Sequence, residues 1–194
     1  MKDFIKKLLR EHLVDELSTT NKCVFGSGAY HTVYTSAKNP NRLYKVGLGN
    51  VVDEWVRIFN ASPNLFPKVY RVFPSKKNPR YFIVEIEKLN TTYAEQDFTT
   101  VAEISGNFNR TKDTYNDRIY LSELDEEKVG KLIQFIKDRR YAEQETNELI
   151  NLVTKWCKYL ITITPLIQEH KEYTDFHGGN FGYDNNGNIK AIDV

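Results

Sequence analysis

The sequence predicts an α+β protein of two lobes, in which a five-stranded antiparallel sheet with one helix precedes a small, mostly helical lobe. Two observations predict this division. Between residues 21 and 89, five short runs rich in β-branched and aromatic residues alternate with turns of glycine, proline and asparagine, which is typical of antiparallel strands. Between residues 121 and 194, two apolar patterns of helical period precede a glycine-rich loop and a hairpin signal.

The predicted sheet lobe covers residues 21–89. Its strands are expected at residues 22–25, 30–35, 42–46, 69–73 and 81–86. A helix is expected at 51–59, where Val52, Trp55 and Phe59 recur at helical spacing before Pro63 ends the pattern. This lobe follows an amphipathic helix predicted at residues 1–20.

The remaining residues predict a minimal second lobe. Residues 90–120 are polar and rich in threonine, asparagine and aspartate, so we expect a loop or insert there. Residues 121–194 predict two helices, at 124–140 and 147–169, and then a hairpin turning at Asn186–Gly187. The 194 residues together are expected to form a single domain.

Composition restricts the kinds of partner. The net charge is +1, so no global electrostatic attraction to nucleic acid or an anionic membrane is expected. No stretch approaches the roughly 20 apolar residues of a membrane span, and Lys6 and Lys7 interrupt the first helix where a signal peptide would be apolar. Cys23 and Cys157 are far apart, which favours two free thiols in a reducing cytoplasm, although one disulfide is an alternative.

Gly26, Ser27 and Gly28 lie between two predicted strands, and Lys45 is in the centre of the next strand. Glycine allows the backbone to approach a phosphate closely, with N–H groups as donors. An ordinary β-turn and an exposed lysine on an edge strand are the alternatives for the two features taken separately. Their succession favours a phosphate-binding site in which the Lys45 ammonium reaches the phosphates.

Three residues near the C-terminus supply oxygen ligands at set spacings. Asp175 and Asn180 are five residues apart, and Asp193 follows thirteen residues later, after the hairpin. A carboxylate at Asp175 can accept the proton of a hydroxyl group, and oxygens of Asn180 and Asp193 suit Mg²⁺. Each alone could be a turn former, but the set downstream of a glycine turn and a strand lysine favours a site. His177 is expected to hold this loop in shape, and the glycines at 178 and 179 to permit its turn.

From Gly26 to Asp193, these residues resemble the protein-kinase-like superfamily. The loop Asp175-Phe-His-Gly-Gly-Asn180 resembles the Asp-x-His-x-Gly-Asn loop of aminoglycoside and choline kinases more than the His-Arg-Asp motif of eukaryotic protein kinases. A closer resemblance is to the early serine/threonine protein kinases of T-seven-type bacteriophages. Those kinases have a Gly-x-Gly turn, a Pro-Asn-Arg-x-x-Lys-Val-Gly stretch and this loop in the same order; here the stretch covers residues 40–47.

The resemblance implies ATP and Mg²⁺ as cofactors and a role for each candidate residue. Asp175 and Lys45 would be catalytic, and Asn180 and Asp193 would bind the metal. The residues implied to bind ATP are Gly26, Ser27, Gly28, Val33, Lys45, Glu54 and Glu85. Val33 would pack on the base, Glu54 would pair with Lys45, and backbone groups from Glu85 to residue 89, at the hinge between the lobes, would meet the adenine.

The resemblance further implies phosphorylation of serine or threonine in host proteins, including transcription and RNA-processing machinery. Two departures leave alternatives open. His31 stands where the third glycine of the kinase loop is expected, and no activation segment follows Asp193 in this chain. We therefore expect either a truncated chain or a minimal kinase. The alternatives are a catalytically weak kinase fold that inhibits a host protein by binding it, and a small-molecule phosphotransferase.

Overall fold

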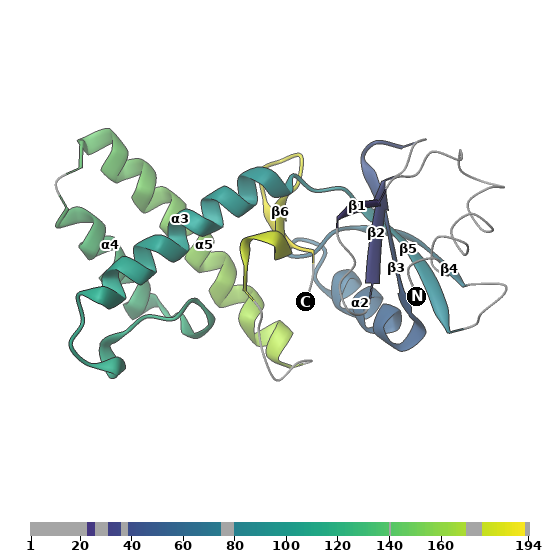
Figure 1. Cartoon of the computed structure of the whole chain (residues 1–194), viewed down its shortest axis with the longest axis horizontal. Helices are drawn as coiled ribbons and strands as arrows, with labels where there is room; N and C mark the ends of the chain where they lie inside the picture. The colour runs from purple at the N-terminus through teal and green to yellow at the C-terminus, as the bar shows by residue number, and fades with distance from the viewer. Residues whose placement is uncertain are drawn as a thin grey trace. The chain divides into compact units, whose positions relative to one another are not determined.

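The computed structural model describes residues 23–25, 31–35, 39–74, 80–139, 141–169 and 176–192. The chain divides into two compact units, Met1–Leu89 and Asn90–Val194 (Figure 1). Within the described residues, the first contains a five-stranded sheet and the helix α2, and the second is mostly helical. The predicted α+β class is therefore confirmed. The helix predicted at residues 1–20 and the turn at Gly26, Ser27 and Gly28 lie outside the described residues.

The sheet of the first unit has the strand number and direction that the sequence predicts. Its strands are β1 (Cys23–Phe25), β2 (His31–Thr35), β3 (Arg42–Leu48), β4 (Val69–Pro74) and β5 (Tyr81–Glu87). They lie in the order β1-β2-β3-β5-β4, and every neighbouring pair is antiparallel. β3 and β5 are thus interior strands, and the five central residues of β3 are all buried.

Helix α2 (Gly49–Ala61) covers the predicted 51–59 segment and extends it at both ends. Its buried face consists of Val52, Trp55, Ile58 and Phe59. These residues recur every three or four positions, which is the spacing of one helical face. The Phe59 ring stacks on Phe66 at 5.3 Å between centroids, so the apolar side of α2 continues into the segment after it.

The segment predicted as a loop is a long helix, and that prediction is wrong. Helix α3 covers Thr91–Arg110, and the Asn90 side chain caps it by accepting a hydrogen bond from the Tyr93 amide. Its buried residues are Ala94, Phe98, Val101, Ser105 and Phe108. The apolar stripe is only one residue wide and includes a serine, so the polar residues around it conceal the helical period.

Ser105 occupies a core position because its hydroxyl has a partner there. The hydroxyl donates to the Ile119 carbonyl at 2.8 Å, and the Asn109 side chain bonds both the Ile119 amide and its carbonyl. These bonds fix the 3₁₀ turns η1 (Tyr115–Asp117) and η2 (Leu121–Glu123) of the next segment against α3. Satisfied buried polar groups of this kind are tolerated in a core.

Helices α4 (Glu126–Lys137) and α5 (Glu143–Gln168) lie side by side (Figure 1). They correspond to the helices predicted at 124–140 and 147–169. Asp125 caps α4 by accepting from the Lys128 amide. Cys157 is buried on α5, and burial raises the pKa of its thiol to about 12, which makes it a poor nucleophile.

The predicted C-terminal hairpin is present. Strands β6 (Phe181–Tyr183) and β7 (Ile189–Ala191) are antiparallel, and the 3₁₀ turn η3 (Gly178–Asn180) precedes them. Gly187 has a positive φ of 77°, which explains the glycine in this turn. The Asp184 carboxylate accepts from the amides of Asn186 and Asn188 and so closes the connection between the strands.

Among the helices in the described ranges, none is long and apolar enough to cross a membrane.

Candidate active site

Lys45 is a buried residue of an interior strand. Its residue exposure is 1%, and its strand neighbours are Val33 on β2 and Val84 on β5. The ammonium nitrogen lies 3.9 Å from the centroid of the Trp55 ring on α2. A desolvated cation over an indole ring gains about 2 kcal/mol. The exposed edge-strand alternative for Lys45 is therefore excluded.

The other nucleotide-binding candidates of the first unit are partly described. Val33 is buried directly opposite Lys45, so the two side chains share one face of the sheet. Glu54 lies in α2 next to Trp55, but its side chain is outside the described residues, as are Gly26, Ser27 and Gly28. The proposed Lys45–Glu54 pair remains a prediction.

Glu85 lies inside β5, not at its end. Its strand partners are Tyr44 on β3 and Arg71 on β4, and β5 continues to Glu87. The strand predicted at 81–86 thus extends one residue further than expected. The amides of Glu87 and Lys88, in the predicted hinge, donate to the Lys68 and Asn41 carbonyls of the same unit. The sheet therefore already uses part of the backbone that we expected to meet an adenine.

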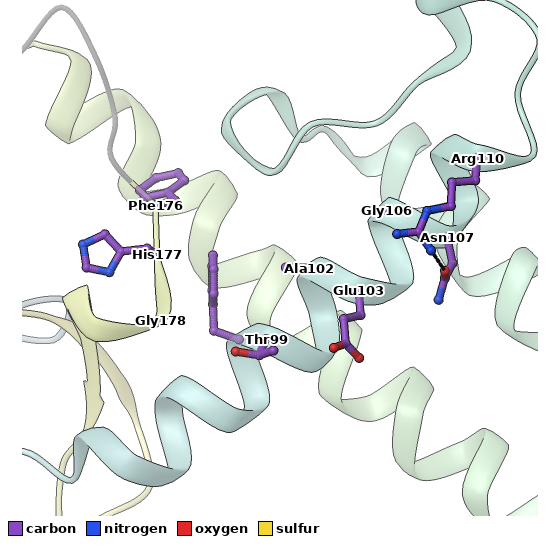
Figure 2. A pocket seen from close by; sticks show the side chains of 10 residues that line it. Thr99, Ala102, Glu103, Gly106, Asn107, Arg110, Phe176, His177 and Gly178 are labelled. Carbon is purple, nitrogen blue, oxygen red and sulfur yellow. Dashed lines mark hydrogen bonds between the residues drawn. The ribbon is translucent and has the colours of Figure 1, made fainter.

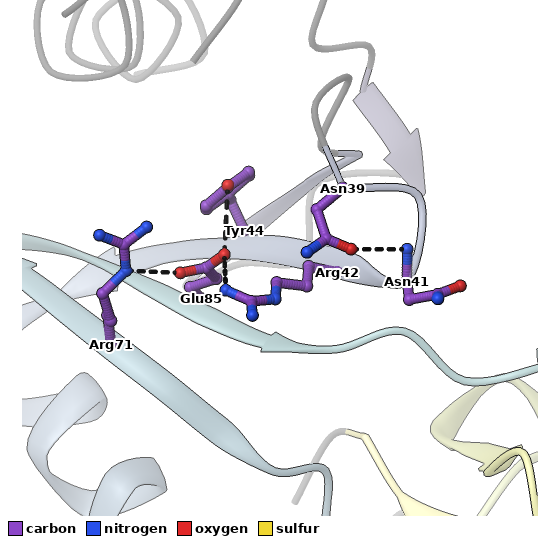
Figure 3. A network of polar contacts seen from close by, with 6 residues as sticks. All are labelled: Asn39, Asn41, Arg42, Tyr44, Arg71 and Glu85. Atoms are coloured by element: carbon purple, nitrogen blue, oxygen red, sulfur yellow. Dashed lines mark hydrogen bonds and ion pairs between the residues drawn. The ribbon is translucent and has the colours of Figure 1, made fainter. Parts of the chain in front are cut away.

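The buried Glu85 carboxylate is the centre of a polar network (Figure 3). It accepts from Arg42 Nη1 at 2.8 Å and Arg71 Nε at 2.9 Å, and the Tyr44 hydroxyl lies at 3.4 Å. Burial alone would raise the pKa of Glu85, but the hydrogen bonds from both arginines outweigh it and lower the pKa below its ordinary value. Because Lys45 pairs with Val84, Glu85 faces the opposite side of the sheet from Lys45. Its carboxylate stabilises the sheet.

In the second unit, Asn180 ends the loop that begins at the predicted catalytic residue Asp175. The Asn180 amide donates to the His177 carbonyl at 3.0 Å, which closes η3. The Asn180 carbonyl accepts from the Ile192 amide at 2.8 Å. Ile192 is the residue before Asp193 in the sequence. Asp175 and Asp193 themselves lie outside the described residues.

Gly178 and Gly179 are explained by close packing around this loop. A Cβ on Gly178 would lie 2.8 Å from Glu95 Cγ and 3.1 Å from Glu95 Cα on α3, and one on Gly179 would lie 3.1 Å from the His177 ring. Contacts under 3.0 Å force a neighbour to move. Glycine at 178 therefore allows the loop to rest directly on the backbone of α3.

Aromatic rings anchor both ends of the loop. Phe176 follows Asp175, and Phe181 follows Asn180. Their centroids are 5.8 Å apart, and the Phe181 ring also packs on Phe98 and Trp156 at 5.2 and 5.3 Å. Aromatic pairs of this geometry contribute about 0.5–1.5 kcal/mol each beyond the area that they bury. The loop is thus fixed to the core on each side.

A cavity of about 570 Å³ adjoins the loop. Along α3 it is lined by Thr99, Glu103, Asn107 and Arg110, and at the loop by Phe176, His177 and Gly178 (Figure 2). The Arg110 guanidinium donates to the Asn107 side chain at 3.0 Å. These α3 residues were missed by the sequence analysis, because residues 90–120 were predicted to be a loop. Their three- and four-residue spacing is the signal that could have identified one helical face.

The donors present fit Mg²⁺ and a nucleotide in their chemistry. An amide oxygen of Asn180 and a carboxylate of Asp193 are hard ligands, and the buried Lys45 ammonium can bind phosphate oxygens. Among the described residues, no three His, Cys, Asp or Glu side chains gather into a metal-binding group. The predicted metal site depends on Asp193, which lies beyond those residues.

No protein-family profile and no curated protein sequence matches the chain. The solved structures that it resembles include an amicoumacin kinase in complex with AMP-PNP, Ca²⁺ and Ami, at 15% identity and a TM-score of 0.39. A choline kinase, LicA from Streptococcus pneumoniae, follows at 13% and 0.39, and APH(2")-IIia in complex with GDP and kanamycin at 10% and 0.38. The alignments cover 100%, 98% and 98% of this chain and 66%, 68% and 71% of those chains. All three TM-scores are below 0.5. The chemistry of the site is therefore argued only from the residues of this chain.

Gly178→Ala is expected to lower the free energy of unfolding by about 1–3 kcal/mol, the usual cost of overpacking. The new methyl group would meet the backbone of Glu95, which cannot rotate away. Gly130→Ala is the control, because a Cβ on that α4 glycine meets nothing within 4 Å and should stabilise the helix by about 0.4–1 kcal/mol. Urea unfolding measures both. Equal effects of the two substitutions would contradict the packing of the loop on α3.

Glu85→Gln is expected to cost about 2 kcal/mol at pH 7, because charge-assisted hydrogen bonds become neutral ones. The folded-state pKa of Glu85 is lowered, so its contribution is present above the ordinary carboxyl pKa of about 4.3 and is lost as the pH falls through the folded value. The difference from wild type should therefore shrink between pH 6 and pH 3 in urea titrations.

Glu126→Gln, at an exposed position in the first turn of α4, is the control and should cost no more than about 1 kcal/mol. A Glu85→Gln deficit that stays constant from pH 7 to pH 3 would be inconsistent with the ionised network.

Proposed function

We propose that the chain is an ATP-dependent phosphotransferase whose metal site is formed by Asn180 and Asp193. The observation that carries this proposal is the hydrogen bond from the Ile192 amide to the Asn180 carbonyl at 2.8 Å. It joins the end of the loop to the residue before Asp193, across the base of the hairpin. The antiparallel β6–β7 hairpin between them brings its two ends together, which supports a shared site for Asn180 and Asp193.

Phosphoryl transfer requires positioned charges more than covalent chemistry from the protein. When bound, Mg²⁺ would neutralise charge on the phosphate oxygens. Asn180 and Asp193 would hold it through hard oxygens. Lys45, whose cation is buried beside Trp55, would bind the phosphates of ATP. Asp175 would orient the acceptor hydroxyl and accept its proton.

Two classes of acceptor have support. The first is serine or threonine of a protein, in an infected host if the chain is phage-encoded, with transcription or RNA-processing machinery as targets. Its support is the order of the Gly26–Ser27–Gly28 turn, the 40–47 stretch and the Asp175–Asn180 loop, which resembles that of phage early kinases.

The second class is a small hydroxyl-bearing molecule, and the cavity at the loop supports it. Its volume of about 570 Å³ is within the range of small-molecule sites, and His177 and Gly178 of the loop line it. Glu103 provides a carboxylate in its wall, which would favour an acceptor with an amine or other cationic group.

Asp193→Ala is expected to reduce phosphate transfer from labelled ATP at least about 100-fold, in line with loss of one electrostatic contact to the reacting group. Asp113→Ala, at an exposed residue outside the site, is the control and should retain activity. Transfer is measured with Mg-ATP and two acceptor sets, a host lysate and a panel of hydroxylated amines. Equal transfer by wild type and Asp193→Ala would refute the metal-site assignment.

Two further measurements separate catalysis from binding alone. ATP at 100 times its Kd should stabilise an ATP-binding fold by about 2.7 kcal/mol, which a melting-temperature shift detects. A kinase-fold binding module would block its partner equally well with Asp175→Asn and would transfer no phosphate. That result would replace the proposed function with the inhibitory one.

Glu103→Gln is expected to raise the KM of a cationic small-molecule acceptor about tenfold, because a charged hydrogen bond is worth about 1.5–3 kcal/mol. The kcat should change little, since Glu103 is proposed only to bind the acceptor. Glu127→Gln, an exposed acid on α4 outside the cavity, is the control. Steady-state kinetics at varied acceptor concentration test this role of Glu103. An unchanged KM would exclude Glu103 from acceptor binding.

A further inference from the structure

The Tyr183 hydroxyl joins three elements of the second unit. It donates to Asp97 Oδ2 on α3 at 2.6 Å and accepts from Trp156 Nε1 on α5 at 3.1 Å. Burial, and then the hydrogen bond to Asp97, raise the pKa of Tyr183 far above its ordinary value. The proton therefore stays on the tyrosine, and the hydroxyl remains a donor to Asp97.

The Tyr183 backbone is hydrogen-bonded as well as its side chain. Its amide donates to the Asn90 carbonyl at 2.9 Å, and its carbonyl accepts from the Asn90 amide at 2.8 Å. Asn90 is the first residue of the second unit and also caps α3. The point at which the chain enters this unit is thus bonded to the β6 strand.

Lys155 makes further contacts with this end of the hairpin. The Lys155 ammonium lies 4.4 Å from the centroid of the Tyr183 ring and donates to the Gly187 carbonyl at 2.9 Å. Lys155 thereby connects α5 to both the ring and the turn of the hairpin. Tyr183 is in this way fixed from α3, α5 and the Asn90 backbone.

The opposite end of β6 carries the proposed metal ligand. Phe181 and Tyr183 pair with Ala191 and Ile189 across the short hairpin. Asn180 comes directly before β6, and its carbonyl accepts from Ile192 directly after β7. With only three residues in each strand, a shift at Tyr183 reaches Asn180 without an intervening loop to absorb it.

We propose that Tyr183, with Asp97 as its hydrogen-bond acceptor, is a positioning residue that holds Asn180 in place for metal binding. The role of Tyr183 in metal binding rests on the proposed function. The contacts by which Tyr183 fixes the β6–β7 hairpin do not. Neither residue touches nucleotide or metal in this assignment. They act through the β6–β7 hairpin.

Amide hydrogen exchange of the ligand-free protein tests the structural step. Tyr183→Phe keeps the ring and removes the hydroxyl, and a buried hydrogen bond is worth about tenfold in an opening equilibrium. Exchange at the Ile192 and Tyr183 amides is expected to accelerate about tenfold. Ser105→Ala is the matched control, because it removes another buried hydroxyl bond of α3, to Ile119, and should leave both rates unchanged.

Titration with Mn²⁺ in the presence of a non-hydrolysable ATP analogue tests the functional step. Paramagnetic broadening of amide signals around Asn180 follows metal occupancy without any turnover. Tyr183→Phe is expected to raise the Mn²⁺ concentration at half-saturation about tenfold, while Ser105→Ala leaves it as in wild type. In activity assays, the half-saturating Mg²⁺ concentration should rise by the same factor at unchanged kcat.

Asp97→Ala provides a second variant if Tyr183→Phe folds poorly, because Asp97 is only partly buried and its truncation leaves the ring of Tyr183 in place. Unchanged Ile192 exchange in both variants would overturn the proposal. Faster exchange with unchanged metal affinity would also overturn it, since the hold would then be structural only. A wild type that binds neither metal nor nucleotide would refute the proposed function. The exchange rates would still show whether Tyr183 fixes the β6–β7 hairpin.

Discussion

The packing of Phe181 against Phe98 and Trp156 is the contact on which the second unit depends. It joins α3, α5 and the β6–β7 hairpin at the residue directly after Asn180. Phe176 adds its ring from the other end of the loop. Because interiors pack at nearly crystalline density, the positions of these rings also fix the backbone between them. The loop can therefore be short and rich in glycine and still have a defined path.

The first unit meets a different constraint, since it buries a cation and an anion in one sheet. Lys45 lies on one face under Trp55, and Glu85 lies on the other between two arginines. A buried carboxylate without a partner is costly, and both arginine side chains pair with Glu85 from partly exposed positions. The arginines explain why Glu85 can be buried as a carboxylate. Glu85 thus has a structural reason to be acidic that is independent of any nucleotide.

Much of the fold followed from local patterns. The five strands, α2, α4, α5 and the hairpin were predicted because their apolar residues recur at periods of two or 3.6 and turn residues separate them. Helix α3 was not, because Ser105 is in its core and its apolar stripe is narrow. The cavity along α3 was missed for the same reason. A residue such as Ser105 becomes a core residue only when Ile119, fourteen positions away, supplies its acceptor.

The sequence by itself determined the α+β class, the strand succession and the candidates Lys45, Asp175, Asn180 and Asp193, because these depend on residue type and spacing along the chain. Tertiary structure decided which of the described candidates are buried, and beside what. It placed Lys45 in an interior strand, assigned Glu85 to an arginine network and joined Asn180 to Ile192. Hydrogen bonds and burial arise between residues distant in sequence, and no local pattern encodes which partner each group finds.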